Sequence, residues 1–455
     1  MSQSQSFFNS NESSSIFSAI KSRKSAGGQA GCRLLYTSEV NYCSQCKSHI
    51  ESGFTNSPAY DSKMVCELPN YGHLSSCWLK IRFAKATGTG ISTSATNFGV
   101  LTENAGAFCW NRARLIADGV VIAECFPEQV IAKYYKHSSD GKRRTFQQLV
   151  GGWKSNATHE AASKISEVDP SLRAEAGSQT LYCPLPFFFD AIEENINKAL
   201  PLGVLDRVFV ELDMNQKTFV SHLTQVHGHL VTGLDIEDMR IVSVLTELSP
   251  DEERMYRASS FEAGGDPLSV LGYNCIKHEE TFTNSGGSQI DFKVSMLSGQ
   301  VGRLYIACLD NQHSTGEHNH FLNYAIESII LSANGVDMYK LDGLEDNRKV
   351  LEDWTNGDYS HDGEATNSSV NPAGIYVMDF KAIGGDKKST SMSGSLNFSN
   401  LSAPVLKVKV SASIGYSNVP VAGNHSCKIV VLAEQHNIVS YATNNAGRTT
   451  IRSIS

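Results

Sequence analysis

Apolar and polar residues alternate in many short stretches of the chain, a pattern that predicts β-strands. In CWLKIRF, apolar side chains fall at every second position from Cys77 to Phe83, while Lys80 and Arg82 point to the opposite side. Further stretches have this character: RVFVELDM at Arg207, MRIVSVLTEL at Met239, QIDFKVSML at Gln289, RLYIACL at Arg303, VLKVKVSASI at Val405 and KIVVLAEQ at Lys428. Turns rich in Gly, Asn and Asp separate them, as in SANGVD with its Asn334-Gly335 pair. Because no alternation of strands with helices is visible, the sequence predicts antiparallel β-sandwiches.

The segment LYCPLPFFFD is unusually apolar for a stretch that cannot form regular structure. Pro184 and Pro186 exclude an ordinary helix or a central strand, and Phe187, Phe188 and Phe189 follow the second proline directly. The simplest interpretation is an isolated aromatic cluster in the core. The neighbouring sequence favours a more specific one.

A short helix is predicted immediately after the three phenylalanines. Asp190 can cap it, with Glu193 completing the capping pattern, and Ile192 and Ile196 share one face before Pro201 ends it. The strand RVFVELDM follows. The predicted unit is therefore an apolar clamp, a helix and a strand.

A related arrangement recurs in STSMSGSLNFSNLSAPVLKVKV. A turn at Gly394 precedes a short segment around Asn397 and Phe398, Pro404 breaks it, and an alternating strand follows. Both copies place a connector that ends in proline directly before a strand. We therefore expect two similar sandwiches in tandem.

Composition agrees with a strand-rich protein and narrows its function. The chain has 455 residues, of which 41% are hydrophobic and 19% charged, and its formal net charge is -8. An acidic balance argues against a general nucleic-acid binder, and no apolar run of about 18 residues predicts a transmembrane helix. The polar start MSQSQSFFNSNESSS leads us to expect no signal peptide.

The cysteines and histidines do not form a convincing metal or catalytic site. Eleven cysteines are scattered, and the lone C-x-x-C of Cys43 and Cys46 is followed by Cys66 and Cys77 at a spacing that fits no zinc finger well. We expect reduced, partly buried thiols and no metal or cofactor. The sequence contains neither G-x-S-x-G nor G-x-x-x-x-G-K, and we predict that the protein is not an enzyme.

At this point the motifs resemble a known family. LYCPLPFFFD resembles the I-P-L-P-F-W-F stretch of the double jelly-roll major capsid proteins of large DNA viruses and their polinton-like and virophage relatives. Further matches follow in the family's order: YGHLSSCWLKIRF, LIADGVVIAECFPEQVI, ELSPDEERMYRA, QIDFKVSMLSGQVGRLYIAC, IILSANGVDMY, GIYVMDFKAI, SGSLNFSNL and AEQHNIVSYATNNAG. They extend from about Tyr71 to Gly447. Phe188 replaces the family's tryptophan and Asn400 its arginine, so the viral lineage stays open.

The resemblance implies an all-β fold of two tandem eight-stranded antiparallel jelly rolls, with short helices in the connecting loops. The Ser-, Gln-, Asn- and Gly-rich composition of residues 1–30 predicts a flexible arm. The resemblance divides the rest of the chain into a first jelly roll at 31–247, a linker at 248–261 and a second jelly roll at 262–455. The prolines and phenylalanines of LYCPLPFFFD would anchor a connector between two late strands, where they fill the end of the first jelly roll and its contact with the second.

The resemblance also implies a structural function. Three copies would form a pseudo-hexagonal homotrimer, and many trimers would tile an icosahedral shell of a virion assembled inside the infected cell. The expected partners are neighbouring capsomers, minor capsid and penton proteins and, through the basic and aromatic arm, an internal membrane. We expect no specific nucleic-acid binding.

Two other functions remain as alternatives at this stage. A two-domain cupin-like metal enzyme would use His318, His320 and Glu327, but the glutamate lies too far from the second histidine and no further histidine follows a P-x-G turn. A carbohydrate-binding β-sandwich is compatible with the strands alone. It leaves the ordered series of motif matches unexplained.

Overall fold

The computed structural model describes residues 46–84, 87–89, 100–101, 104–137, 145–146, 149–150, 179–187, 199–216, 221–222, 230–233, 235–251, 253–254, 268–284, 289–310, 324–342, 375–380, 394–414, 425–443 and 449–454. Antiparallel strands dominate this part of the chain, with few short helices, among them α3 (Ala105–Phe108) and α4 (Pro127–His137). The predicted arm 1–30, the predicted helix after Asp190, and Phe188 and Phe189 lie outside the described residues. Among the described helices, none is long and apolar enough to cross a membrane.

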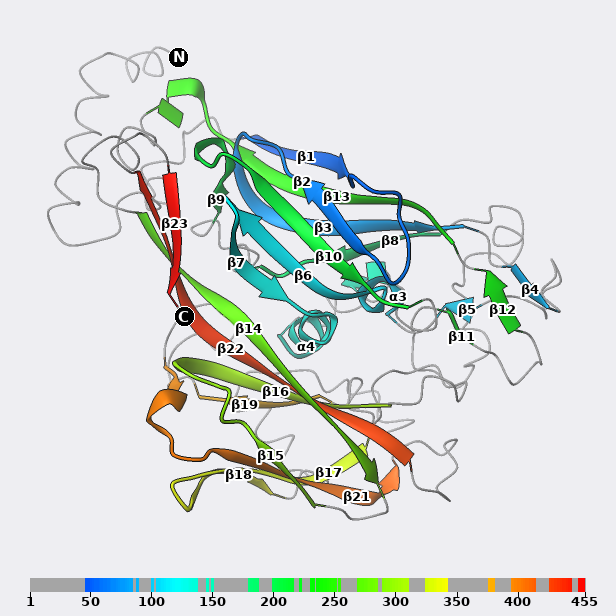
Figure 1. Cartoon of the computed structure of the whole chain (residues 1–455), viewed down its shortest axis with the longest axis vertical. Helices are drawn as coiled ribbons and strands as arrows, with labels where there is room; N and C mark the ends of the chain where they lie inside the picture. The colour runs from blue at the N-terminus through cyan, green and yellow to red at the C-terminus, as the bar shows by residue number, and fades with distance from the viewer. Residues whose placement is uncertain are drawn as a thin grey trace, which may run out of the picture.

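A five-stranded and a four-stranded sheet form the two layers of the first sandwich (Figure 1). Sheet 1 has the order β1 (Cys46–Gly53), β13 (Ile236–Glu247), β3 (His73–Phe83) and β8 (Gln179–Pro184), with β9 (Leu200–Pro201) also beside β3. Sheet 2 has the order β2 (Lys63–Glu67), β10 (Val208–Met214), β6 (Trp110–Ala117) and β7 (Val120–Cys125). Two small ribbons pair β4 (Thr87–Thr89) with β12 (Leu230–Gly233) and β5 (Val100–Leu101) with β11 (Ser221–His222).

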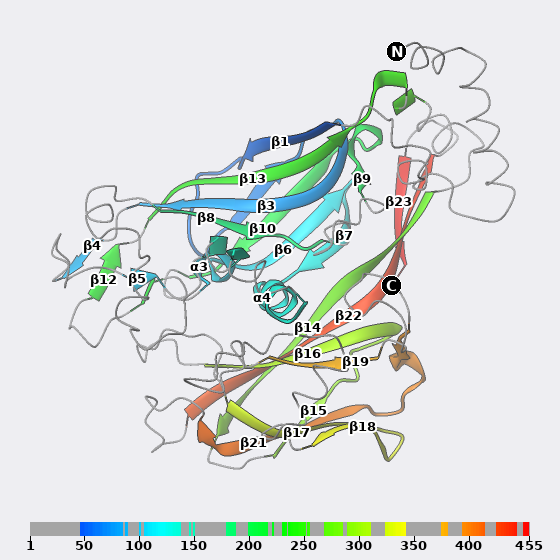
Figure 2. The ribbon, with the colours of Figure 1, turned by 180° about the vertical axis from the view of Figure 1, so that it is seen from behind.

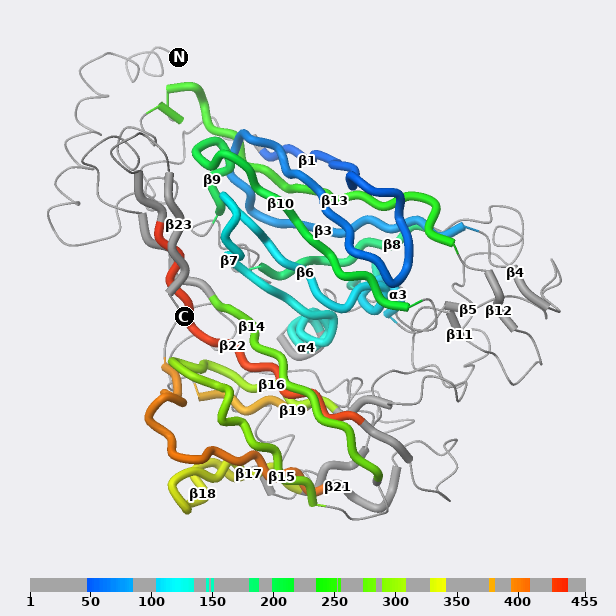
Figure 3. Tube along the Cα trace, viewed as in Figure 1, coloured from blue at the N-terminus to red at the C-terminus, as the bar shows by residue number. Residues whose placement is uncertain are grey.

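The second sandwich repeats this plan. Sheet 3 has the order β14 (Leu268–Asn284), β22 (His425–Thr443), β16 (Gln300–Asp310) and β19 (Ile375–Asp379), with β20 (Leu396–Asn397) beside β16 and β23 (Thr449–Ile454) beside β22. Sheet 4 has the order β15 (Gln289–Lys293), β21 (Val405–Ile414), β17 (Tyr324–Ala333) and β18 (Val336–Asp342). Each of these strands except β23 thus takes the place of a strand in the first sandwich. Figure 3 traces the two successive units along the chain.

Local geometry supports the same correspondence. Gly72 and Gly299, with φ of 72° and 66°, both precede the third strand of their sheet and accept a hydrogen bond from a 3₁₀ turn, η3 (Leu202–Val204) or η6 (Phe398–Asn400). The β3–β13 and β16–β22 ladders each carry a bulge shortly after this glycine. A positive φ is a conformation that glycine adopts without strain, so the two glycines fix equivalent turns. The expectation of two similar sandwiches agrees with these features.

The predicted alternation is confirmed in β3. The side chains of Cys77, Leu79, Ile81 and Phe83 are at most 1% exposed. Lys80 and Arg82 lie on the outward face, together with the partly exposed Trp78. The turn predicted at Asn334-Gly335 is also confirmed, since its φ values of 55° and 76° are those of a type I′ hairpin turn between β17 and β18.

The recurring connector is placed differently from the sequence-based expectation. Strand β8 pairs with β3 in the first sandwich as β19 pairs with β16 in the second. When these two pairings are superposed, Phe187 takes the position of Phe380, which follows β19. The segment of Asn397 and Phe398 instead corresponds to Pro201 and Leu202, because both pairs lie where β9 or β20 leads into a 3₁₀ turn. Pro201 is therefore part of β9. The sequence-based correspondence between the two connectors is wrong because it relied on a proline that precedes a strand in both. Their true register depends on the strands with which they pair, which are distant in sequence.

Candidate functional site: the junction between the sandwiches

The two sandwiches contact each other through buried apolar and charged side chains. Helix α4 of the first sandwich lies between sheet 2 and sheet 3 (Figures 1 and 2). The first hydrophobic core extends into sheet 3. Its members from that sheet are Cys275, Tyr305, Ala307, Val430, Leu432 and Val439.

Sheet 3 is buried on both faces, which distinguishes it from sheet 1. In β16, Leu304 and Ile306 belong to the second core, whereas Tyr305 and Ala307 belong to the first. Strands buried on both sides have continuous apolar runs rather than strict alternation. The runs LYIACL and IVVLA are such signals in the sequence. We interpreted them only as alternating strands and so missed the second buried face.

Helix α4 begins at Pro127, a residue whose fixed φ suits the first position of a helix. Glu128 lies in the first turn, where a carboxylate is favoured by the helix dipole. Val130 and Ile131 are buried in the first core. The helix therefore presents an apolar side to its own sandwich and also brings charged side chains to the junction.

Two buried ion pairs cross the junction with opposite polarity. Glu128 Oε1 lies 2.8 Å from Lys277 Nζ on β14, and Lys133 Nζ lies 2.9 Å from Glu434 Oε1 on β22. The side chains of Glu128, Lys277 and Glu434 are no more than 10% exposed. The first sandwich thus supplies one acid and one base, and the second supplies the matching base and acid.

Neighbouring carboxylates offset the cost of burying the Lys277 ammonium group. Burial alone would lower the pKa of Lys277, but the neighbouring Glu128 and Glu279 carboxylates raise it above its ordinary value. Lys277 Nζ also lies 5.6 Å from the centroid of the Phe126 ring, within the range of a cation–π contact. The ammonium group therefore stays charged at neutral pH.

A third buried pair stiffens sheet 3 beside the junction. Arg303 Nε donates to Asp379 Oδ2 at 2.9 Å, joining β16 to β19, and both side chains are 5% exposed. Burial raises the pKa of the neighbouring Tyr305 well above its usual value, and Glu434 adds to the effect. Burial alone would lower the pKa of Arg303, but the Asp379 and Glu434 carboxylates raise it above its usual value, so Arg303 and Tyr305 both keep their protons at neutral pH.

The cysteines that the structure describes in full are buried thiols that are not joined in disulfides. Burial raises the pKa of Cys109, Cys125 and Cys275 well above its ordinary value, and that of Cys66 and Cys183 to about 12. Protonated, inaccessible thiols are neither nucleophiles nor metal ligands. Within the described residues, no group of three His, Cys, Asp or Glu side chains could hold a metal ion.

The structure disperses the motif residues that the sequence singled out. Pro184 ends β8 opposite Trp78, and Phe187, 1% exposed, donates its N–H to the Leu185 carbonyl across Pro186 at 2.8 Å. This tight turn places Phe187 in the first core.

The remaining motif residues lie in the second sandwich. Phe398 is in the second core, and Asn397 Oδ1 caps its turn by accepting from the Ser399 N–H at 3.0 Å. Gly394 precedes β20, and Asn334-Gly335 forms the distant β17–β18 hairpin. The motif residues are thus separate structural positions and do not form one site. The functional residues of the junction, Glu128, Lys133, Lys277 and Glu434, were missed, because single charged residues carry no spacing signal for a distant partner.

Comparison with known proteins finds solved structures of similar architecture. No family model matches the sequence, and no curated protein matches it. Among solved structures, a chain of the PBCV-1 virus capsid has a TM-score of 0.66 at 14% identity, with 93% of this chain and 100% of that chain covered. The Faustovirus major capsid protein gives 0.59 at 12% identity, covering 93% and 97%, and the Sputnik virophage structure gives 0.58 at 11%, covering 92% and 90%.

The chain has the double jelly-roll fold. The likeness extends over both sandwiches, which are from here called the first and second jelly rolls. The predicted all-β fold class of two tandem antiparallel jelly rolls is therefore confirmed. Sequence identity of 11–14% carries the fold alone, and the roles of individual residues are argued from this chain.

Proposed function

We propose that the protein is a viral major capsid protein whose function is structural. The observation that carries the proposal is the likeness over more than nine-tenths of the chain, through both jelly rolls and their connection, to chains whose names or titles identify a virus capsid, a major capsid protein and a virophage. The protein belongs to the virion, and it assembles inside the infected cell.

The internal repeat supports assembly as a homotrimer. The junction is heterologous, because the helix-bearing side of the first jelly roll contacts the outward face of sheet 3 in the second. A heterologous contact between similar units closes into a ring when the rotation permits. Three chains supply six jelly rolls, and a similar contact between copies would complete a pseudo-hexagonal ring, of which many tile an icosahedral shell.

The described chemistry gives an enzymatic alternative no support. A cupin-like metal site would need His318 and His320, which lie outside the described residues, together with Glu327. The buried charges Glu128, Lys133, Lys277 and Glu434 pair with one another across the junction. Neither a carbohydrate-binding function nor specific nucleic-acid binding is favoured by an observation on this chain.

Light scattering on the purified protein tests the assembly unit. The expected mass is three times the chain mass of 49.6 kDa at micromolar concentration. A monodisperse monomer that retains its β-sheet circular dichroism spectrum would refute the proposal of a self-assembling capsomer.

Neighbouring capsomers, minor capsid proteins and penton proteins are the proposed further partners, with the arm of residues 1–30 facing the shell interior or an internal membrane. The arm contains Phe7, Phe8 and Phe17 beside the basic cluster from Lys21 to Lys24. Deleting residues 2–30 should leave trimers intact and lower the yield of closed particles from virus-infected cells. Undiminished particle yield would contradict a role for the arm.

A further inference from the structure

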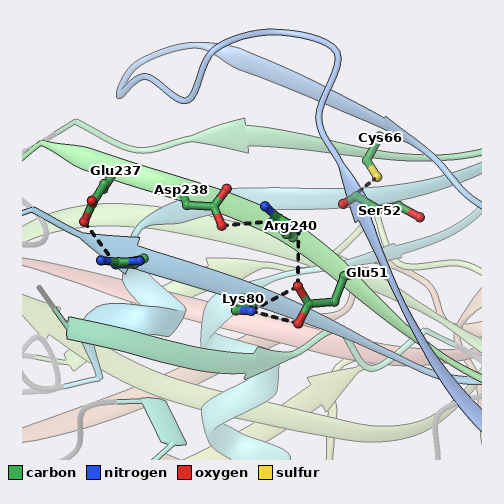
Figure 4. A network of polar contacts seen from close by, with 8 residues as sticks. Glu51, Ser52, Cys66, Lys80, Glu237, Asp238 and Arg240 are labelled. Carbon is green, nitrogen blue, oxygen red and sulfur yellow. Dashed lines mark hydrogen bonds and ion pairs between the residues drawn. The ribbon is translucent and has the colours of Figure 1, made fainter.

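The outward face of sheet 1 carries an ordered network of charged side chains (Figure 4). Lys80 Nζ on β3 donates to both carboxylate oxygens of Glu51 on β1, at 2.7 and 3.0 Å, and Arg240 on β13 lies 3.6 Å from the same carboxylate. Arg240 also contacts Asp238, and Arg82 contacts Glu237 at 3.0 Å. In Figure 2 this sheet faces the viewer, and no described element lies across it.

The equivalent face of the second jelly roll is covered over its central strands. When residues are counted from the equivalent glycines Gly72 and Gly299, Lys80 of sheet 1 takes the position of Ala307 of sheet 3. Arg240 pairs with Lys80 and Val430 pairs with Ala307, so Arg240 and Val430 are also equivalent. The same pairings align Glu51 with Lys277. Ala307 and Val430 are at most 2% exposed, because they pack against the first jelly roll. A face that is buried in one repeat is therefore open in the other.

The second jelly roll has a matching unpartnered edge. Strand β7 of the first jelly roll lies beside β14 and β23 of the second. Its counterpart β18 is the edge strand of sheet 4, and no described strand pairs with its outer side. Val336 and Met338 on β18 are 64% and 46% exposed. Asp337 between them is opposite in charge to Arg240 and half-exposed, and it lies 3.4 Å from Lys407 Nζ of its own sheet.

The geometry points to the outward face of sheet 1 as the docking surface for the β18 side of the second jelly roll of another copy. This inference rests on the proposed capsomer and adds the identity of the contacting faces and their chemistry. Within one chain the junction is apolar around two buried ion pairs, whereas the contact between chains is built on a polar, solvent-accessible network. Contacts of the second kind are screened by salt, while buried ones are screened much less. The contact between copies is therefore the salt-sensitive one in the ring.

Two double variants test the two sides of this contact. The first, Lys80→Glu with Arg240→Glu, alters the face of sheet 1. The second, Val336→Asp with Met338→Asp, alters the edge of sheet 4. We expect each to weaken trimer formation by roughly a hundredfold in light scattering, because like charges or desolvated carboxylates oppose docking.

The matched control, Arg207→Glu with Lys293→Glu, reverses two exposed charges, one directly before β10 and one at the end of β15, and should leave the trimer intact.

A mixture of the two double variants makes the test specific. Because the contact is heterologous, each mixed pair retains one unaltered interface, so the mixture should yield dimers although each variant alone is monomeric. Raising NaCl from 0.1 M to 1 M shortens the Debye length from about 10 Å to about 3 Å and should dissociate wild-type trimers before the chains unfold.

Trimers that persist in both variants would overturn the inference, as would a mixture that stays monomeric or a trimer indifferent to salt. The wild type separates this from the underlying proposal. A wild-type monomer refutes the capsomer, whereas wild-type trimers with unaffected variants refute only the assigned faces. The edge variant keeps the test decisive should the sheet 1 variant fail to fold.

Discussion

Removing one partner of a buried ion pair at the junction should strongly destabilise the contact between the jelly rolls. The change is Lys277→Met, which keeps an unbranched side chain one atom shorter and deletes its charge. Lys277 Nζ lies 2.8 Å from Glu128 Oε1, and the two side chains are 10% and 6% exposed. Glu128 Oε2 has no hydrogen-bond partner among the residues that the structure describes. The variant therefore leaves a buried carboxylate without compensation.

The magnitude follows from this geometry. Breaking a buried pair from one side costs about 3–5 kcal/mol, whereas replacing both partners by apolar residues of similar volume is often neutral or stabilising. A loss of this size is comparable to a large part of the stability of one domain, about 5–15 kcal/mol. The double variant Lys277→Met with Glu128→Met should recover most of it.

Denaturant unfolding monitored by circular dichroism and tryptophan fluorescence measures the free energies for the double-mutant cycle. Arg207→Met is the control, since Arg207 and its partner Glu67 are 66% and 47% exposed and exposed pairs contribute about 0–1 kcal/mol. A loss below 1 kcal/mol for Lys277→Met, or a double variant less stable than the single one, would refute the reasoning.

Three further results are expected. Phe187→Ala should lower the free energy of unfolding by about 3–5 kcal/mol, since its side chain is 1% exposed, and a change as small as that of Val336→Ala would show that the connector is peripheral. A thiol reagent should label the buried cysteines only in denaturant. Rapid labelling of these cysteines in the folded protein would contradict their burial. These cysteines are Cys66, Cys77, Cys109, Cys125, Cys183 and Cys275. Burial raises the pKa of Glu279, but Lys277 and Lys428 lower it below its ordinary 4.5. The stability that Glu279 contributes is therefore present above pH 4.5 and is lost as the pH falls through the lower pKa of the folded protein. Glu279→Gln should flatten the decline in melting temperature over that pH range. An unchanged decline would show that these ion pairs do not contribute to stability.

The sequence predicts local features well where the physical cause is local. Alternation in CWLKIRF places its side chains on the correct faces because successive residues of a strand point to opposite sides. Asn334-Gly335 predicts its turn because the two residues tolerate positive φ. The fold class followed from many such elements and from the order of the family motifs.

Features that depend on distant pairing could not be predicted in this way. The correspondence of Phe187 with Phe380 is set by which strands pair with β3 and β16, and the charges of Glu128 and Lys277 meet only after both jelly rolls have formed. The second buried face of sheet 3 was readable in principle from its continuous apolar runs. The boundaries of the predicted linker, 248–261, remain a prediction, although Glu253 within it contacts the buried His73 at 3.0 Å.

Electron microscopy of the purified wild-type protein tests the proposed function most directly. Class averages of single particles should show a compact ring of six lobes with threefold symmetry, because each of three chains contributes two similar jelly rolls. Two-lobed particles of single-chain size, in protein whose β-sheet spectrum is intact, would contradict the account of the chain as a trimeric capsid building block.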